Sequence, residues 1–326
     1  MLSPATFRRR YMDETVRMRG GARVRIVERP GMWMAAEDQR ALVADLQTVL
    51  RAAIPAGSLD YGAASGDPER LASSVLTIVY SADDDRAVAF NALAFLDCEL
   101  RGQPVDVLHL GLVMVDPAVR ASGLSGVLYG LTCFLLFARR QLRPLWISNV
   151  TQVPAVFGMV SESFEQVYPT CDPRDRQSFA HLQLARQIMA RHRHVFGVGP
   201  EAEFDEEHGI IRNAYTGGSD NLKKSFDESA RHRHPQHNEW CARMLDYDRG
   251  DDVLQLGRFT LRAAGGYYTR SAPALSPGAL AMQFVLRALE AFVAPVVQWL
   301  SADQPMGALR PARPILSGPP RRALHG

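Results

Sequence analysis

Three long apolar runs that follow one another closely constrain the fold of this chain most. They occupy residues 74–80, 87–100 and 105–115. The first and third are rich in β-branched residues, and the second is apolar over most of its length, which favours strands. The connecting sequences, SADDDR and RGQP, are too short for a helix and have the composition of hairpin loops. The runs therefore predict three antiparallel neighbours in one sheet.

Helical patterns surround these strands. Residues 37–53 carry apolar side chains at helical spacing, and residues 123–140 form a strongly apolar helix pattern. A short buried strand at 145–149 and a helix at about 154–166 follow. The order helix, three strands, helix, strand, helix predicts an α/β (α+β) fold, in which a mixed, mostly antiparallel sheet is flanked by helices.

The remaining sequence suggests extensions of this core. Residues 22–28 alternate as a strand would, or belong to a flexible arm, and 60–69 has a loop composition. Candidate strands lie within 195–215, a short helix at 238–247 and a long helix at 280–300. We expect an N-terminal arm (1–30), a main domain (31–220), an extension (221–275), and an amphipathic C-terminal helix with a disordered tail (276–326).

The composition argues against several classes of function and site. The formal net charge is only +2, so no overall field attracts nucleic acid, and no nucleic-acid partner is expected. The four cysteines are widely separated and form no CxxC pair, which argues against a disulfide framework or a structural zinc site. The basic N-terminus lacks the apolar stretch of a signal peptide, so the expected location is cytoplasmic.

The segment with the clearest chemistry joins the third strand to the next helix. A strand ends at Val115, Pro117 prevents its continuation, and the sequence then turns through Arg120 and Gly123 into a helix. Small residues let a ligand approach this backbone closely. The first amides of a helix have no intrahelical partner and favour an anion such as a pyrophosphate. A close-packed strand-to-helix connection with no ligand is the alternative.

This segment resembles the acyl-CoA-binding motif of the GNAT superfamily of N-acyltransferases. Val115-x-Pro117-x-x-Arg120-x-x-Gly123-Leu-Ser-Gly126 is similar to V-x-P-x-x-R-G-x-G-(I/L)-(G/A), and the order of elements is similar to the family core. The departures are Ala121 and Ser125, both small. The resemblance covers about the middle half of the chain.

The resemblance implies how a donor would bind. The backbone of Val113, Met114 and Val115 would pair with the pantetheine arm as a substitute strand, and an amide near Val113 would polarise the thioester carbonyl. Asn149 would contact the pantetheine, or would simply end its strand. The pyrophosphate would be held by the turn, which comprises Arg120, Ala121, Ser122, Gly123, Leu124, Ser125 and Gly126.

The acid and base are less defined. Many members of the family place a Tyr where this chain has Phe157, which has no proton to donate; Tyr168 or Tyr129 would have to replace it. The expected bases are His109 and Glu99, with Asp97 as a further candidate, although a core histidine and solvated carboxylates are the alternatives.

The resemblance thus implies an acyltransferase without a metal. The donor would be acetyl-CoA, a longer acyl-CoA or an acyl-carrier protein, and the acceptor a small-molecule or lipid amine. The alternative is a non-catalytic domain that binds acyl-CoA or a protein partner.

Two further features suggest partners. The two RHRH sequences, 191–194 and 231–234, indicate a solvated basic surface, because His234 and His237 have no acidic or cysteine partner at ligand spacing. The apolar helix pattern from Leu280 to Leu300 contains two charges and Pro295, which argues against a membrane span. It predicts docking on the core or a homodimer interface, with peripheral membrane contact as the alternative.

Overall fold

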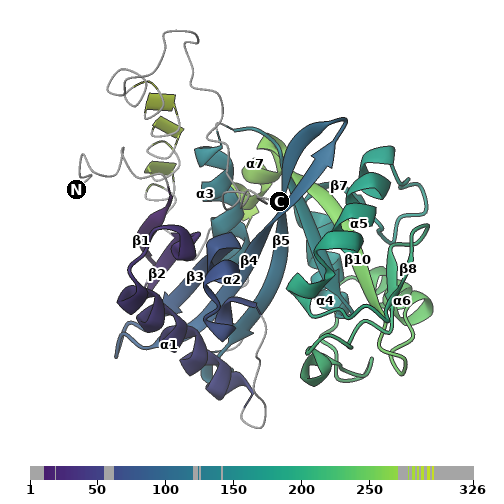
Figure 1. Ribbon diagram of the computed structural model, residues 1–326, viewed down its shortest axis with the longest axis horizontal. Coiled ribbons are helices and arrows are strands. Elements are labelled where there is room, and N and C mark those ends of the chain that lie inside the picture. The colour runs from purple at the N-terminus through teal and green to yellow at the C-terminus, as the bar shows by residue number, and fades with distance from the viewer. Residues whose placement is uncertain are drawn as a thin grey trace, which may run out of the picture.

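The computed structural model describes residues 11–18, 20–54, 62–119, 124, 126–140 and 142–270, with single positions between 278 and 296. Its described strands form one ten-stranded sheet in the order β1-β2-β3-β4-β5-β6-β10-β9-β8, with β7 paired to β10 (Figure 1). The strands are β1 (Asp13–Arg17), β2 (Arg23–Glu28), β3 (Ser74–Tyr80), β4 (Ala87–Leu100), β5 (Gln103–Val115), β6 (Leu145–Thr151), β7 (Glu165–Tyr168), β8 (Glu203–Asp205), β9 (Ile210–Arg212) and β10 (Asp252–Phe259).

Every described pair of neighbouring strands is antiparallel except β5 and β6, which run parallel. The predicted fold class, a mixed and mostly antiparallel sheet flanked by helices, is therefore confirmed. The predicted meander is also confirmed, because β3, β4 and β5 are consecutive antiparallel neighbours.

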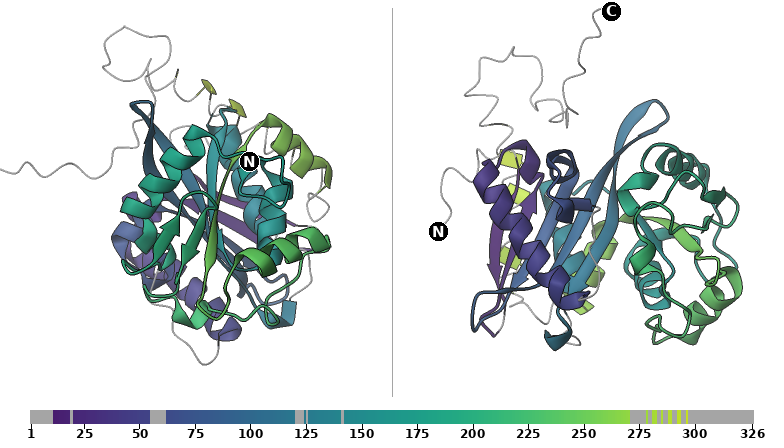
Figure 2. Two further views of the ribbon diagram at one scale, coloured as in Figure 1. Left: turned by 90° about the vertical axis from the view of Figure 1, so that its right-hand side faces the viewer. Right: turned by 60° about the horizontal axis from the view of Figure 1, so that its bottom comes forward.

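Helices cover both faces of the sheet (Figure 2). The described helices are α1 (Ala36–Ala53), α2 (Pro68–Ser73), α3 (Thr132–Arg139), α4 (Pro154–Ser163), α5 (Phe179–Arg191), α6 (Pro235–Met244) and α7 (Leu261–Arg270). On one face, α3 and α7 share an apolar core with alternate residues of β3 to β6. On the other face, α1 and α2 pack beside β3 and β4, and α5 packs beside β4 and β10.

The sheet includes strands from outside the expected main domain. β1 and β2 come from the first thirty residues, and β10 comes from residues 221–275. β10 lies between β6 and β9, so the chain returns to the middle of the sheet after leaving it. Hydrogen bonds of the Gln255 side chain stabilise β10 in this position: its amide nitrogen donates to the carbonyl oxygen of Pro169 at 3.1 Å and to the hydroxyl of Ser161 at 3.1 Å.

Three local expectations need correction. The stretch 60–69 is not all loop, because Asp67 accepts the amide of Glu69 and thereby caps α2. The helix expected at 154–166 ends at Ser163, and β7 begins at Glu165. The described part of the helix expected at 123–140 starts as a π-helical turn over Gly126–Leu131 before α3.

Hydrogen bonds that link the sheet to the start of α3 stabilise that π-helical turn. Asn91 on β4 donates to the carbonyl oxygen of Leu128, and the hydroxyl of Thr132 donates to the same oxygen at 3.0 Å. Thr132 in turn contacts the hydroxyl of Thr77 on β3 at 2.5 Å. The sheet thus fixes the π-helical turn, which begins at Gly126, the last residue of the turn that the sequence assigns to a pyrophosphate.

All four cysteines are free thiols. Within the described ranges, every helix is too short or too polar to cross a bilayer. The segment from Leu280 to Leu300 lies largely outside the described residues.

Candidate functional site

The parallel pair β5 and β6 separates halfway along its length. Pairing runs from Val107 beside Trp146 to Leu110 beside Asn149, and it stops there. β5 continues to Val115 on the side of β4, whereas β6 continues to Thr151 on the side of β10. Among the described strands, none pairs with the edge of β5 that faces away from β4 beyond Leu110.

A bulge in β5 marks the separation. Ala92 pairs with Leu112 and Ala94 with His109, so β5 has one more residue than β4 between these pairs. Gly111 lies within the bulge, and a Cβ atom at this position would stand 2.3 Å from the carbonyl oxygen of Ala92. Only glycine allows β4 to approach the bulge this closely.

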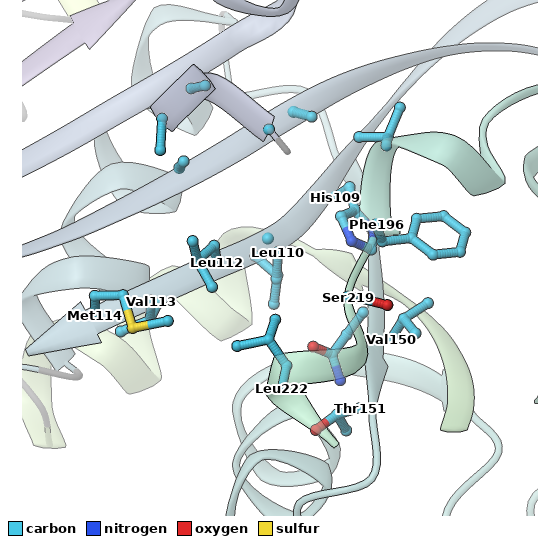
Figure 3. A pocket seen from close by; sticks show the side chains of 18 of the residues that line it. His109, Leu110, Leu112, Val113, Met114, Val150, Thr151, Phe196, Ser219 and Leu222 are labelled. Carbon is cyan, nitrogen blue, oxygen red and sulfur yellow. The ribbon is translucent and has the colours of Figure 1, made fainter. Parts of the chain in front are cut away.

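A cavity of about 1120 Å³ opens between the separated strands. One wall is the edge of β5, and the other is the end of β6 with the residues that follow it. Figure 3 shows Leu110 and Leu112 of β5 on one side, Val150 and Thr151 of β6 on the other, and Leu222 between them. Further lining comes from several residues within 62–74, from residues 194–196, and from residues between 215 and 252. The cavity therefore exposes a strand edge to whatever occupies it.

His109 lies in this wall, but it is buried and uncharged. Only 2% of the residue is exposed, Nδ1 lies 3.0 Å from Oγ of Ser148, and the ring of Phe196 lies 4.9 Å away. Burial, with a smaller effect of His192, lowers the pKa of His109 to about 3. A base this weak takes up little of the proton of an ammonium group at neutral pH.

Asp252, at the start of β10, is the carboxyl group in the lining whose pKa lies near neutrality. The residue is 6% exposed, and burial raises its pKa to about 7, with the charge of Asp251 adding to the effect. The hydroxyl of Tyr215 donates to Oδ1 at 3.1 Å. Asp252 is not among the site residues predicted from the sequence, although an Asp-Asp pair directly before an apolar run is a visible signal.

Tyr129 and Asn149 also line the cavity. The hydroxyl of Tyr129 donates to the carbonyl oxygen of Gly111 at 3.4 Å, which places it at the bulge. Nδ2 of Asn149 donates to Oε1 of Gln255 at 3.3 Å, so its side chain is part of the link between β6 and β10.

The structure brings His109, Val113, Met114, Val115 and Asn149 together around the cavity. Two other candidates are not part of its lining. Glu99 is near the hairpin end of β4, where its backbone bonds to the side chain of Gln187. Tyr168 donates to the carbonyl oxygen of Glu207 and lies against His181.

Most of the expected pyrophosphate turn lies outside the described residues, namely Arg120, Ala121, Ser122, Gly123 and Ser125. Leu124 is buried in the apolar core, and Gly126 begins the π-helical turn. Phe157 is fully buried and stacks on Trp240 with ring centroids 4.4 Å apart, away from the cavity lining.

Comparison with known proteins adds fold similarities only. No family model and no curated protein matches this chain. An acetyltransferase of Trypanosoma brucei is 21% identical with a TM-score of 0.24, covering 34% of this chain and 72% of its own. A ribosomal-protein-S5-alanine acetyltransferase of Vibrio fischeri is 10% identical with a TM-score of 0.31, covering 75% and 96%. TM-scores this low give no basis for transferring an activity to this chain.

Proposed function

We propose that the chain is an N-acyltransferase that moves an acyl group from acyl-CoA, or from an acyl-carrier protein, to an amine. The observation that carries the proposal is the separation of β5 from β6 around a cavity, with the edge of β5 from Gly111 to Val115 along its wall. A pantetheine arm has amide groups that can pair with such an edge as an added strand would.

The bulge in β5 supports the proposal that a backbone amide at this position polarises the thioester carbonyl. A bulge leaves one residue outside the regular ladder and turns its backbone groups away from the partner strand. In the proposal, an amide next to Gly111, near Val113, donates to the thioester oxygen when negative charge develops on it. The turn from Arg120 to Gly126 would hold the pyrophosphate of the same donor.

Asp252 is the proposed base. An acceptor ammonium entering the cavity gives a proton to the Asp252 carboxylate, and its nitrogen lone pair then attacks the thioester carbonyl carbon. The tetrahedral intermediate collapses as the C–S bond breaks, the nitrogen loses its second proton to water, and the released thiolate takes a proton. Tyr129 is the proposed donor of that proton, since its hydroxyl lies at the bulge. Exchange with water then restores the proton donor and the Asp252 carboxylate. A pKa near 7 suits a base that works at neutral pH.

The charges around the cavity favour a cationic acceptor. Four carboxyl groups line it, and only two lysine or arginine side chains do. The carboxyl groups belong to Asp67, Glu69, Glu228 and Asp252, and the two basic side chains are Arg70 and Lys224. The cavity exceeds the range of roughly 300–1,000 Å³ typical of small-molecule sites, which leaves room for a pantetheine arm beside an acceptor or a longer acyl chain.

The test measures thiol release from acetyl-CoA and longer acyl-CoA esters across a panel of primary amines. We expect amine-dependent release by the wild type and a fall in kcat of roughly 10²–10⁴-fold in Asp252→Asn, the range that loss of a general base produces. Affinity for CoA should change little in this variant. Asp248→Asn is the matched control, because Asp248 is exposed and lies outside the cavity lining.

A second variant tests the donor side. Gly123→Glu should abolish CoA binding, because it adds a bulky anion to the expected pyrophosphate turn. CoA binding without turnover for any amine would instead support a non-catalytic acyl-CoA-binding domain. No CoA binding by the wild type would refute both functions.

A further inference from the structure

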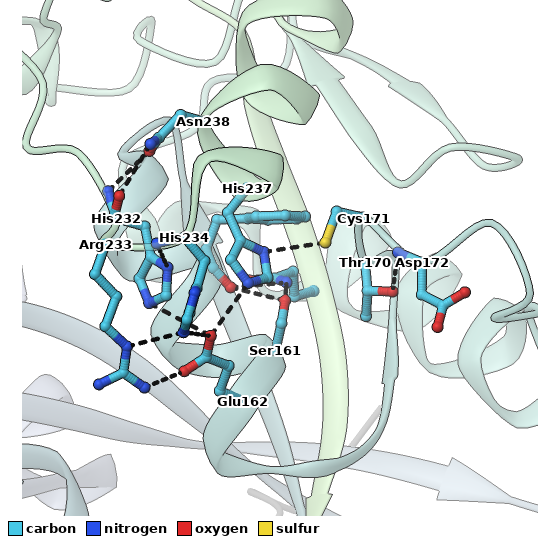
Figure 4. Close-up of polar contacts among 12 residues, drawn as sticks. Ser161, Glu162, Thr170, Cys171, Asp172, His232, Arg233, His234, His237 and Asn238 are labelled. Carbon is cyan, nitrogen blue, oxygen red and sulfur yellow. Dashed lines mark hydrogen bonds and ion pairs between the residues drawn. The ribbon is translucent and has the colours of Figure 1, made fainter.

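Side chains from two distant parts of the chain meet at one oxygen atom, Oε1 of Glu162 on α4. Nε2 of His237 on α6 lies 3.4 Å from it, Nε2 of His234 3.6 Å, and Nε2 of His232 3.8 Å (Figure 4). Ligand atoms of Glu162, His232 and His237 all lie within 4.8 Å of one another. We call Glu162, His232 and His237 the histidine cluster.

These distances fit a shared ion better than hydrogen bonds. An N–H···O bond joins its heavy atoms over about 2.7–3.2 Å, and all three contacts to Oε1 are longer. Tetrahedral zinc binds nitrogen or oxygen at about 2.0–2.2 Å, which places neighbouring ligand atoms about 3.3–3.6 Å apart. The contacts of His237 and His234 fall at this spacing, and that of His232 is slightly longer.

The cluster is built into the fold and is not a solvated surface, in contrast to the expectation from the RHRH sequence. His237 is 4% exposed, and the side chain of His232 is 10% exposed. The ring of His232 packs onto Gly158 of α4, where a Cβ atom would stand only 2.6 Å from its Cγ. The side chain of Asn238 bonds to both the amide and the carbonyl of His232, at 2.8 and 2.9 Å.

Neighbouring groups orient the donors. Nδ1 of His237 lies 3.3 Å from Sγ of Cys171, so the sulfur can accept its hydrogen and leave Nε2 free for a ligand. Arg233 bonds to the other oxygen of Glu162, Oε2, at 2.7 Å, and so leaves Oε1 facing the imidazoles.

We propose that the histidine cluster binds a divalent transition metal ion of the zinc type. Nε2 of His234 is a further donor for the fourth position; it lies 3.6 Å from the same carboxylate oxygen and accepts a hydrogen bond from Arg233 at 3.1 Å. Two histidine nitrogens with a carboxylate oxygen, and a third imidazole beside them, are ligands that zinc accepts.

Metal binding rearranges local contacts: an ion at Nε2 of His234 replaces the hydrogen bond from Arg233, and a contact of His232 changes as well. Nδ1 of His232 accepts the amide of His234 at 3.2 Å, and this requires the hydrogen of a neutral ring to sit on Nε2. An ion at Nε2 moves that hydrogen to Nδ1 and replaces the contact. The bonds from Asn238 hold the backbone of His232 in either case.

The ion would tie α4 to the segment that leads into α6. Ala155 of α4 already donates to the carbonyl oxygen of Ala230 at 3.0 Å, and Ala230 lines the cavity between β5 and β6. The metal would therefore stabilise a wall of that cavity. The proposal does not depend on the acyltransferase function.

The test is metal binding by the full chain after chelation and dialysis. We expect one zinc ion per chain by titration and elemental analysis, the visible absorption bands of four-coordinate Co²⁺ on substitution, and a higher Tm with zinc. Glu162→Gln and His237→Gln should each weaken binding by more than about tenfold and lose the Tm increase. His208→Gln is the control, because His208 pairs with Asp205 and is not a member of the histidine cluster.

Circular dichroism of each metal-free variant would show that it is folded before binding is compared. The proposal is overturned if the reloaded wild type holds no zinc, since the cluster is then a network of protons and charges only. It is equally overturned if folded Glu162→Gln and His237→Gln bind zinc as tightly as the wild type.

Discussion

At the scale of single residues, burial decides which titratable groups of the cavity are useful. His109 and Asp252 both lie in its lining and both are buried, yet burial shifts their pKa values in opposite directions. Burial disfavours the charged form of each, so the pKa of the imidazole falls to about 3 while that of the carboxyl rises to about 7. The same desolvation thus makes His109 too weak a base at neutral pH and brings the pKa of Asp252 close to neutrality.

The raised pKa of Asp252 predicts a pH-dependent stability. Its ordinary value is 3.8, so the folded chain binds this proton more tightly than the unfolded chain. The resulting stability is fully present below pH 3.8 and is lost as the pH rises through about 7. Relative to the wild type, Asp252→Asn should therefore gain about 2–3 kcal/mol of unfolding free energy between about pH 5 and about pH 8. Urea unfolding of both proteins at the two pH values measures this.

Asp248→Asn serves as the reference in that experiment, because it changes an exposed carboxyl group of the same type. Parallel stability curves for the wild type and Asp252→Asn would show that Asp252 titrates normally. The proposed base would then lose its main support.

At the scale of elements, the local pattern predicts the strands and helices that bury apolar side chains regularly. The expected bounds of β3 and β4 agree with the structure at both ends, because each run is apolar between polar connections. β10 was missed because Gln255 and Arg258 interrupt its apolar pattern. Gln255 is nevertheless fully buried, since α4 and the residue after β7 supply partners that only the folded chain brings near.

The same reasoning applies to the candidate site. The separation between β5 and β6 could be anticipated only through the family resemblance, because strand pairing between residues 39 positions apart leaves no local pattern. Glu162 could not be matched to the histidines for the same reason: it precedes them by about 70 residues and comes from another helix. Glu99 and Tyr168 were chosen from their strand and helix context, which does not reveal what lines a cavity.

The packing of Phe157 on α4 predicts the effect of a Tyr at this position, where many members of the GNAT superfamily have one. Phe157 is fully buried, stacks on Trp240 and does not line the cavity. Phe157→Tyr should therefore not accelerate acyl transfer, and burying a new hydroxyl should cost about 1–3 kcal/mol of unfolding free energy. Turnover and chemical unfolding measure the two effects. Tyr129→Phe, by contrast, should slow acyl transfer, because it removes the proposed proton donor. If Phe157→Tyr instead accelerated transfer, the proton donor would lie on α4.

At the scale of the whole molecule, one sheet joins parts of the chain that the sequence suggested were separate. β10 pairs with β6, β7 and β9, and Leu254 and Leu256 complete the core under α5. No described strand lies after Phe259. The right-hand part of the sheet in Figure 1, which carries one wall of the cavity, therefore depends on residues 252–259.

Two truncations test this dependence. A chain ending at Arg270 keeps every described strand together with α7, so it should unfold cooperatively with a midpoint close to that of the full chain. A chain ending at Arg249 lacks β10, which leaves β6 and β9 without their common partner and exposes apolar side chains on both faces. It should aggregate or lose cooperative unfolding, as urea titration followed by circular dichroism would show. If the shorter chain instead unfolded cooperatively, the residues after Arg249 would be an extension added to a complete domain. The chain ending at Arg270 also tests membrane contact, because it lacks the segment from Leu280 to Leu300. If it binds anionic vesicles more weakly than the full chain does, that segment contacts the lipid surface.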